Sequence, residues 1–450
     1  MHYCTMTRIS ALLFAIEFGM AGASAQGLGG SPYSAYAFGD LYATGQATQA
    51  MMSGTGLALV EPYSTVLGNP ASYQALARPV FEIGTAFRST RSTTALESST
   101  RRDAEFTGFT LGVPFARGKW GLALGLTPFS EVGYNARTAG QVGSDAVTYT
   151  YSGSGGLDRV FAGLARTLYS QRADSLGNTG MRVALGADFN FIFGSIEQTR
   201  DAVFAADAGF SNIRAFSSLV LRAPSVDASL IWQGDLTRKT HRDDGNWRWT
   251  AGVSVSSPTN FQARFNELVT TYVTSSGIEA VRDTIPGGAD SKGNVTVPVK
   301  LGLGLGVQNR HWAFTVEAIQ RPWSTTAVDV PGFSLAAPLR DAVSLAAAAR
   351  YRPGTEEGMF GRAVYRMGLR WSRAPQEVRG EGLVGASASA GISFPLNLAQ
   401  TNSWLHLGGE FGQRGTTDLG LVKESQATLW IGVAFTPWRG ERWLTPYKIQ

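Results

Sequence analysis

Apolar residues alternate with small or polar residues in many short stretches of this chain. In residues 297–308 one face carries Val297, Val299, Leu301, Leu303, Leu305 and Val307, and the other carries Pro298, Lys300, Gly302, Gly304, Gly306 and Gln308. A period of two residues is typical of a β-strand. The pattern predicts strands at 80–90, 105–115, 119–128, 157–168, 181–194, 223–235, 247–258, 297–308, 311–321, 342–352, 361–372, 385–394, 403–412 and 426–435.

The length and the two faces of these stretches indicate a membrane barrel. Most are about ten residues long, which is the length that a tilted strand needs to cross a bilayer. In a soluble sheet the outward face would be rich in charged residues and the apolar face would point inward. Here the second face is mostly Gly, Ala and Ser with an occasional charge. The sequence therefore predicts an all-β fold, a fourteen-stranded antiparallel transmembrane β-barrel.

The connections between the predicted strands alternate in length. The short ones are 116–118, 169–180, 236–246, 309–310, 353–360 and 395–402, and the longer ones are 91–104, 129–156, 195–222, 259–296, 322–341, 373–384 and 413–425. Outer-membrane barrels have short periplasmic turns and long extracellular loops. This order predicts a bacterial outer-membrane location with both termini in the periplasm.

Composition and the N-terminus agree with export to a Gram-negative outer membrane. Only 16% of residues are charged, against about 25% in a typical soluble protein. Arg8, the apolar run 9–18 and the Ala23-Ser24-Ala25 site read as a signal peptide over residues 1–25. The single cysteine, Cys4, lies inside that segment, so disulfide and thiolate chemistry are not expected in the mature chain.

Residues 26–78 do not alternate as a strand does. Gly54 and Gly56 interrupt short helical patches, and Asn69-Pro70 reads as a helix start with Asn69 as the cap. Few residues in this segment are charged, so burial inside a barrel suits it better than exposure to water. The predicted organisation is a signal peptide at 1–25, a partly helical N-terminal plug at 26–78, a barrel at 79–438 and a periplasmic tail at 439–450.

The run QAMMSGTGLALVEPYSTVLGNPASYQAL, residues 49–76, resembles the N-terminal signature of two related groups of barrels. These are the FadL-type outer-membrane transporters of long-chain fatty acids and hydrocarbons and the PorV-type barrels of type IX secretion. The resemblance implies a fourteen-stranded barrel with an N-terminal hatch. It assigns Gly54, Gly56, Ala58, Asn69, Pro70 and Ala71 to that hatch.

Little in the sequence indicates an enzyme. The mature chain has three histidines, His241, His311 and His406, and no G-x-S-x-G elbow or H-E-x-x-H motif accompanies them. The GLGLG run at 302–306 lies inside a strand pattern, so it does not read as a phosphate loop. We therefore expect no catalytic site, no cofactor and no metal. The net charge of +5 is spread out, which does not predict nucleic-acid binding but allows contact with outer-membrane lipid or lipopolysaccharide.

The charged residues on the predicted lumen face suggest a ligand with a carboxylate group. Arg362, Arg366 and Arg370 are spaced along one strand and could guide a carboxylate headgroup, because guanidinium pairs well with carboxylate. The alternative is structural pairing with Glu82, Glu317, Glu410 or the plug carboxylates Asp40 and Glu61. Other inward charges are Arg88, Asp188, Asp227, Lys300, Arg321 and Arg350.

One long connection, 259–296, is unusually apolar. Phe261, Phe265, Leu268 and Tyr272 have a helical spacing there. They could form a cap, an apolar entry groove or a partner site, or simply pack the loop.

Three functions remain open from the sequence, the weakest being a structural barrel or adhesin. The first is passive uptake of hydrophobic small molecules, fatty-acid-like or hydrocarbon-like, through a plugged lumen. The second is a non-transporting, PorV-like barrel that serves as a partner of secretion or surface-attachment components.

Overall fold

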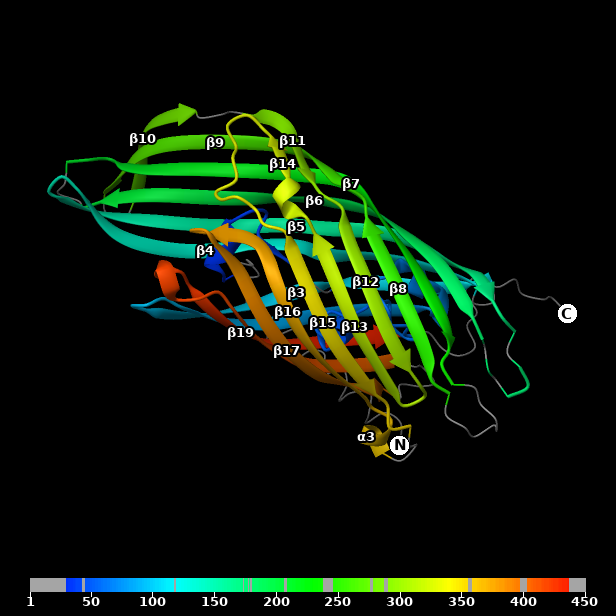
Figure 1. Cartoon of the computed structure of the whole chain (residues 1–450). Helices are drawn as coiled ribbons and strands as arrows, with labels where there is room; N and C mark the ends of the chain where they lie inside the picture. The colour runs from blue at the N-terminus through cyan, green and yellow to red at the C-terminus, as the bar shows by residue number, and fades with distance from the viewer. Residues whose placement is uncertain are drawn as a thin grey trace, which may run out of the picture.

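The computed structural model describes residues 30–42, 45–116, 119–172, 174–176, 178, 180–205, 209–237, 246–275, 278–286, 290–354, 358–396 and 403–436. They form a closed, fourteen-stranded antiparallel barrel (Figure 1), which confirms the predicted fold. The predicted signal peptide, the tail at 439–450 and His241 lie outside the described residues.

Each barrel strand pairs with its neighbours in chain order, and the last strand pairs with the first. Some barrel strands are divided into shorter segments. β8 and β9 form one strand, because both pair with β7. β10, β11 and β12 form the next one, since β10 and β11 pair with β9 and β12 pairs with β8. The short β14 pairs with β11. The segments are β2 (Val80–Thr93), β3 (Ser98–Phe115), β4 (Trp120–Val142), β5 (Asp145–Ser170), β6 (Arg182–Phe204), β7 (Asn212–Asp235), β8 (Arg248–Ser256), β9 (Thr259–Ser275), β10 (Ile278–Pro286), β11 (Ser291–Val297), β12 (Lys300–Gln308), β13 (Trp312–Arg321), β14 (Ala327–Asp329), β15 (Ala342–Tyr351), β16 (Val364–Val378), β17 (Glu381–Leu396), β18 (Ser403–Arg414) and β19 (Lys423–Phe435).

The outward face carries the apolar residues of the alternation. Leu301, Leu303 and Leu305 of β12 expose 54%, 60% and 62% of their surface, and Met367 and Leu369 of β16 are equally open. Such a belt of exposed apolar side chains is unstable in water and matches the lipid-facing surface of a membrane barrel. The described residues contain no helix long and apolar enough to cross a membrane.

Five connections that the sequence predicts as longer loops are largely strand instead. Residues 91–104 and 373–384 mostly belong to β2, β3, β16 and β17. Residues 129–156, 195–222 and 259–296 largely belong to β4, β5, β6, β7, β9, β10 and β11. These strands reach well beyond the rest of the wall on one side of the barrel (Figure 1). Outside a membrane the outward face of a sheet contacts water and carries polar residues, so the apolar-outward alternation that marks the spanning part is lost and the segment reads as a loop. The helical spacing proposed for residues 261–273 is therefore wrong.

The base of this extension is sealed by an apolar cluster. Phe261 and Phe265 of β9 point inward and pack with Phe38, with Trp323 and with Val330 of the connection after β13. The other members of the cluster are Val132, Leu157, Ile192, Ile196, Leu219, Leu221, Ala223, Ala263, Val295, Val297 and Leu339.

The N-terminal part of the described chain lies inside the barrel. It contains η1 (Pro32–Ala35), β1 (Asp40–Leu41), α2 (Ala47–Ala50) and η2 (Pro70–Ala75). We call residues 45–78 the inner segment. Met51 packs with Ala86 of β2 and Trp430 of β19, and Tyr73 packs with Phe161 of β5. The inner segment therefore contacts separate parts of the same ring.

Small residues on the lumen face make room for the inner segment. A Cβ atom on Gly252 of β8 would lie 1.8 Å from the carbonyl oxygen of Leu57, and one on Gly121 of β4 would lie 2.1 Å from that of Tyr73. Backbone against backbone leaves no space for a side chain at these positions.

We predict that Gly252→Val weakens the inner segment without altering the barrel. The added side chain cannot enter the space that Leu57 occupies, and overpacking of this kind costs roughly 1–3 kcal/mol. Limited proteolysis should cut residues 45–78 faster, while the strand content by circular dichroism stays unchanged. Gly409→Val is the control, because a Cβ there meets only one atom, at 3.9 Å; equal cleavage of both variants would contradict the prediction.

Candidate functional site in the barrel lumen

Carboxylates of the wall hold the inner segment by its backbone. Glu317 of β13 accepts hydrogen bonds from the backbone N–H groups of Gly56 at 2.9 Å and of Leu57 at 2.7 Å. Glu82 of β2 accepts from the Thr65 N–H at 2.6 Å and from the Ser64 hydroxyl at 2.8 Å. Each acid accepts hydrogen bonds from at least two donors of the inner segment, so these two acids fix the segment on two sides.

At Glu61 the carboxylate belongs to the inner segment and its partners belong to the wall. Its carboxylate lies 2.8 Å from Arg350 of β15 and 3.4 Å from Arg366 of β16. Burial by itself raises the pKa of Glu61, but the two guanidinium groups outweigh it and lower that pKa from 4.5 to about 2. Arg366 also donates a hydrogen bond to the Ser393 hydroxyl. The same hydroxyl lies 2.7 Å from Nδ1 of His406.

The six residues assigned to the hatch lie together in the inner segment. Asn69 caps η2: its Oδ1 accepts from the Ala71 N–H at 3.1 Å, with Pro70 at the first helical position. The Asn69 side-chain amide donates to the Leu57 carbonyl at 2.5 Å, which ties the Gly54–Ala58 turn to the start of η2. Gly54 has φ +76°, a left-handed conformation that glycine adopts without strain.

The residues of the proposed charge track do not share one environment. Arg362 lies outside β16, is exposed, and donates to the Gly358 carbonyl. Arg366 is buried against Glu61, whereas Arg370 donates to the Ser53 carbonyl and borders a cavity that Glu410 also lines. Glu317 and Glu82 bind backbone rather than arginine. The three arginines therefore do not form a continuous path, because Arg362 falls beyond the strand that carries the other two.

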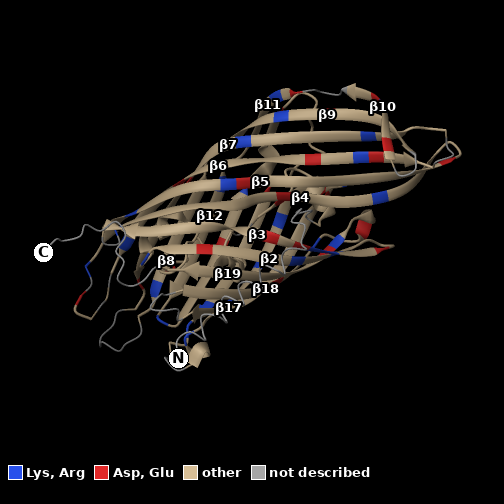
Figure 2. Cartoon of the chain, turned by 180° about the vertical axis from the view of Figure 1, so that it is seen from behind, with Lys and Arg blue, Asp and Glu red and all other residues tan. Residues whose placement is uncertain are grey.

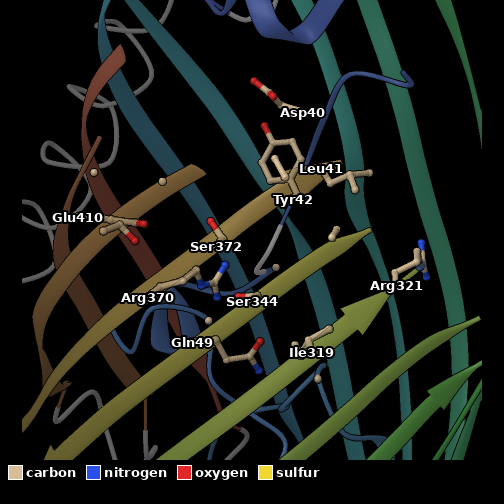
Figure 3. A pocket seen from close by; sticks show the side chains of 18 of the residues that line it. Asp40, Leu41, Tyr42, Gln49, Ile319, Arg321, Ser344, Arg370, Ser372 and Glu410 are labelled. Carbon is tan, nitrogen blue, oxygen red and sulfur yellow. The ribbon is translucent and has the colours of Figure 1, made fainter. Parts of the chain in front are cut away.

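A cavity of about 470 Å³ lies in the lumen beside the inner segment. Figure 3 shows Arg321, Arg370, Glu410, Gln49, Tyr42 and Ile319 around it, from the wall strands and the inner chain. Its cationic lining is Arg88, Arg159, Lys300, Arg321, Arg370, Arg373 and Arg414, and its acidic lining is Asp40, Glu131, Glu317 and Glu410. The cations outnumber the acids, and Leu41, Phe129, Ile319, Trp323 and Val343 add an apolar part.

Three cations of the cavity, Arg159, Lys300 and Arg321, outnumber the two buried carboxylates beside them, Asp227 and Asp188. Arg159 of β5 lies 3.9 Å from Asp227 of β7. Arg321 of β13 stacks over the Trp323 ring at 5.4 Å, and no described carboxylate lies within ion-pair distance of it. Lys300 lines the same cavity. The alternation predicts that Lys300 and Arg321 point inward. Arg159 was missed, although its neighbour Val160 points outward, which places Arg159 on the inward face.

The described wall is interrupted where β3 and β4 separate, which we call the side gap. β3 and β4 pair only from Phe109–Leu126 to Phe115–Trp120, although both strands continue far beyond this ladder. The separation begins at Gly108, where φ is +100° and a Cβ would lie 2.3 Å from the Leu126 carbonyl. Beyond it the edge of β4 pairs with β1 instead, as Asp40–Glu131 and Leu41–Ser130.

Tyr42 joins the two sides of the side gap. Its hydroxyl lies 2.6 Å from Glu105 of β3 and 2.8 Å from Glu131 of β4, and Arg88 of β2 pairs with Glu105 at 2.9 Å. Burial and the two carboxylates raise the pKa of Tyr42 well above 10, so the phenol keeps its proton and can donate. The sequence missed this cluster because Glu131 falls in a segment expected to be a loop.

The family model described as BamG matches residues 6–450. The chain belongs to the BamG family. No match was found among the curated proteins. Two solved structures share the fold of this BamG-family barrel. A FadL homologue from Pseudomonas aeruginosa is 10% identical, with 88% of this chain and 99% of that chain covered and a TM-score of 0.54. The toluene transporter TodX from Pseudomonas putida is 13% identical, with 88% and 98% covered and a TM-score of 0.50.

At this identity the likeness concerns the fold. The expected FadL-type architecture is confirmed at that level, and the PorV-type resemblance of this BamG-family chain stays a prediction. Within the part of the chain that the structure describes, no group of three or more His, Cys, Asp or Glu side chains is arranged to hold a metal ion.

We predict that Glu61 makes the barrel acid-sensitive. Because its pKa is lower in the folded chain, the ion pair contributes stability above about pH 4.5, and this contribution is lost as the pH falls toward 2. Glu61→Gln should remove that part of the pH dependence and lower the thermal midpoint at pH 7, since it leaves two buried guanidinium groups without a carboxylate, at a cost of about 3–5 kcal/mol. The measurement is thermal unfolding in detergent between pH 2 and 7, with the exposed Glu97→Gln as control. A pH profile of Glu61→Gln identical to that of the unaltered chain would rule out this role.

Proposed function

We propose that this chain is an outer-membrane barrel that takes up hydrophobic small molecules bearing an anionic group, such as fatty acids, with both termini in the periplasm. The observation that carries the proposal is the cavity, in which Arg321, Lys300 and Arg159 lie beside apolar side chains. Guanidinium and ammonium groups pair with carboxylates, and the apolar lining suits a hydrocarbon chain. The shared fold with a toluene transporter supports the proposal only as far as architecture.

The side gap offers a route into this cavity. Thr127, Pro128, Phe129 and Glu131, at the point where β4 leaves β3, also line the cavity. Exposed Phe87 and Phe106 on the outer face lie next to the gap, at the edge of the apolar belt. A molecule dissolved in the membrane could therefore pass through the wall if β1 moved away from β4. In this proposal the inner segment acts as the plug and residues 40–42 close the side passage.

A second candidate is the non-transporting barrel that binds a secretion or surface-attachment partner. The buried contacts of Glu61, Glu82 and Glu317 favour it, since they tie the inner segment to the wall on several sides. The extension of β4 to β7 and β9 supplies a surface beyond the membrane for such a partner. The two candidates differ in whether a ligand enters the lumen at all.

We predict that Arg321→Gln weakens binding of a medium-chain fatty acid by about tenfold to a hundredfold. A hydrogen bond to a charged group contributes about 1.5–3 kcal/mol, which the uncharged amide loses. Binding to the purified barrel is measured by calorimetry, with the fatty alcohol of the same chain length as a second probe. The alcohol should be affected little, and Arg362→Gln, outside the cavity, should behave as the unaltered chain. Equal loss for acid and alcohol would mean that Arg321 does not recognise the anionic group.

We also predict that a disulfide between β1 and β4 blocks uptake reversibly. Leu41 and Ser130 are directly paired, and the Cα separation of such pairs suits a disulfide. Leu41→Cys with Ser130→Cys should stop entry of a fluorescent fatty acid into cells, and a reducing agent should restore it. The control is Thr138→Cys with Tyr149→Cys, which joins two strands that are already neighbours. Uptake that persists with the β1–β4 link formed would exclude this route, and absence of uptake in every variant would favour the second candidate.

A further inference from the structure

Three basic side chains form a row on the outer surface of the barrel. Arg222 of β7, Arg264 of β9 and Lys292 of β11 are all exposed, and they alternate with the buried Leu221 and Ala263, which point into the apolar cluster of the lumen. Figure 2 shows Lys and Arg segments following one another across β11, β9 and β7 on this side. The row lies where β7 and β9 continue beyond the ladder of β7 with β8.

Two of these cations face each other directly. Lys292 is the ladder partner of Arg264, and in an antiparallel pair the Cβ atoms of partners are about 4.5–5.5 Å apart. Like charges in this position repel and destabilise the sheet. Asp290 pairs with Arg264 and is itself 45% exposed. Asp329 faces the pair obliquely, as the ladder partner of Asn294.

Arg222 adds a third charge to the same surface. No described acidic side chain lies within ion-pair distance of it, and the nearest outward acid along its row, Asp158, is separated from it by Phe193. Three cations thus face two nearby carboxylates, Asp290 and Asp329, so the row keeps a surplus of positive charge.

The surface next to the row is apolar. Phe193 is the ladder partner of Arg222, and Phe191, Phe189 and Val226 continue downward along β6 and β7 with 41%, 56% and 44% of their surface exposed. The cations thus stand at the border of the belt that faces hydrocarbon. At this depth a headgroup would meet the row while its acyl chains lay against the phenylalanines.

We propose that Arg222, Arg264 and Lys292 dock the phosphate of a membrane lipid in the leaflet next to the extended strands. Phosphate carries enough charge to relieve the repulsion between Arg264 and Lys292, and the guanidinium fork of Arg264 can bind two of its oxygens. A soluble anion would use only the cations, whereas a lipid also covers the apolar strip below them. This site lies on the outside of the barrel and does not depend on the proposed uptake.

The test is native mass spectrometry of the full-length barrel in detergent, titrated with phosphatidic acid or with phosphatidylcholine of the same acyl chains. The unaltered chain should retain phosphatidic acid preferentially. Each basic residue near a membrane surface contributes about a fivefold change in affinity, so the triple variant Arg222→Gln, Arg264→Gln and Lys292→Gln should lose tenfold or more. The matched control is Arg102→Gln, Arg137→Gln and Arg200→Gln, three exposed arginines outside the row, which removes the same charge.

A single substitution covers the case in which the triple variant does not fold. Lys292→Gln relieves the like-charge pair, so it should raise the thermal midpoint slightly while it lowers retention of phosphatidic acid. Equal retention of both lipids, equal loss in the control triple, or unchanged retention in Lys292→Gln would overturn the proposal. Binding of glycerol phosphate as tight as that of phosphatidic acid would also overturn it, because the site would then recognise a free anion and not a lipid.

Discussion

A strand that crosses a membrane must pair its backbone on both edges, because hydrocarbon offers no partner for an N–H or a carbonyl. In this barrel the constraint is met by closing β19 onto β2 and by continuous ladders around the ring. The exception is the side gap, where β3 and β4 part after a seven-pair ladder. It opens near the border of the apolar belt, where the constraint weakens, and β1 supplies part of the missing edge from inside.

The same constraint explains why the chain inside the barrel both pairs with a wall strand, through β1 and β4, and occupies the lumen. Its buried backbone groups have to be paired inside the lumen, and the wall supplies acceptors at Glu317 and Glu82 for the N–H groups of Leu57 and Thr65. Glycines such as Gly252 and Gly121 allow the two backbones to touch. A buried carboxylate without a cation beside it is costly unless several donors surround it, and the inner segment provides those donors.

The lumen and the outer surface use charge in different ways. Inside, Glu61 binds Arg350 and Arg366 at a buried contact, and such pairs specify one arrangement more than they add net stability. In the cavity, Arg321 and Lys300 have no described carboxylate within ion-pair distance, and they share Asp227 with Arg159. Outside, the row of Arg222, Arg264 and Lys292 stands at the edge of the belt. The uncompensated cations, and not the paired ones, are where a ligand would gain most.

The sequence by itself determined the class of fold and the number of strands. Alternation survives wherever one face meets lipid, so Leu301 to Leu305 and Met367 to Leu369 marked their strands correctly. It also determined which side chains of those strands point inward, as for Lys300, Arg321 and Arg366. Alternation is a local property, and each of these features depends only on neighbouring residues.

Only the tertiary structure decided how distant residues meet. The pairing of Glu61 with Arg350 and Arg366, the separation of Arg362 from that group, and the meeting of Tyr42 with Glu105 and Glu131 all depend on register between segments far apart in the chain. The extension escaped detection because its outward face contacts water and lacks the regular run of apolar side chains that marks the spanning part, as in residues 129–156. A side gap has no sequence signal, since it is the absence of a ladder between two strands that each alternate normally.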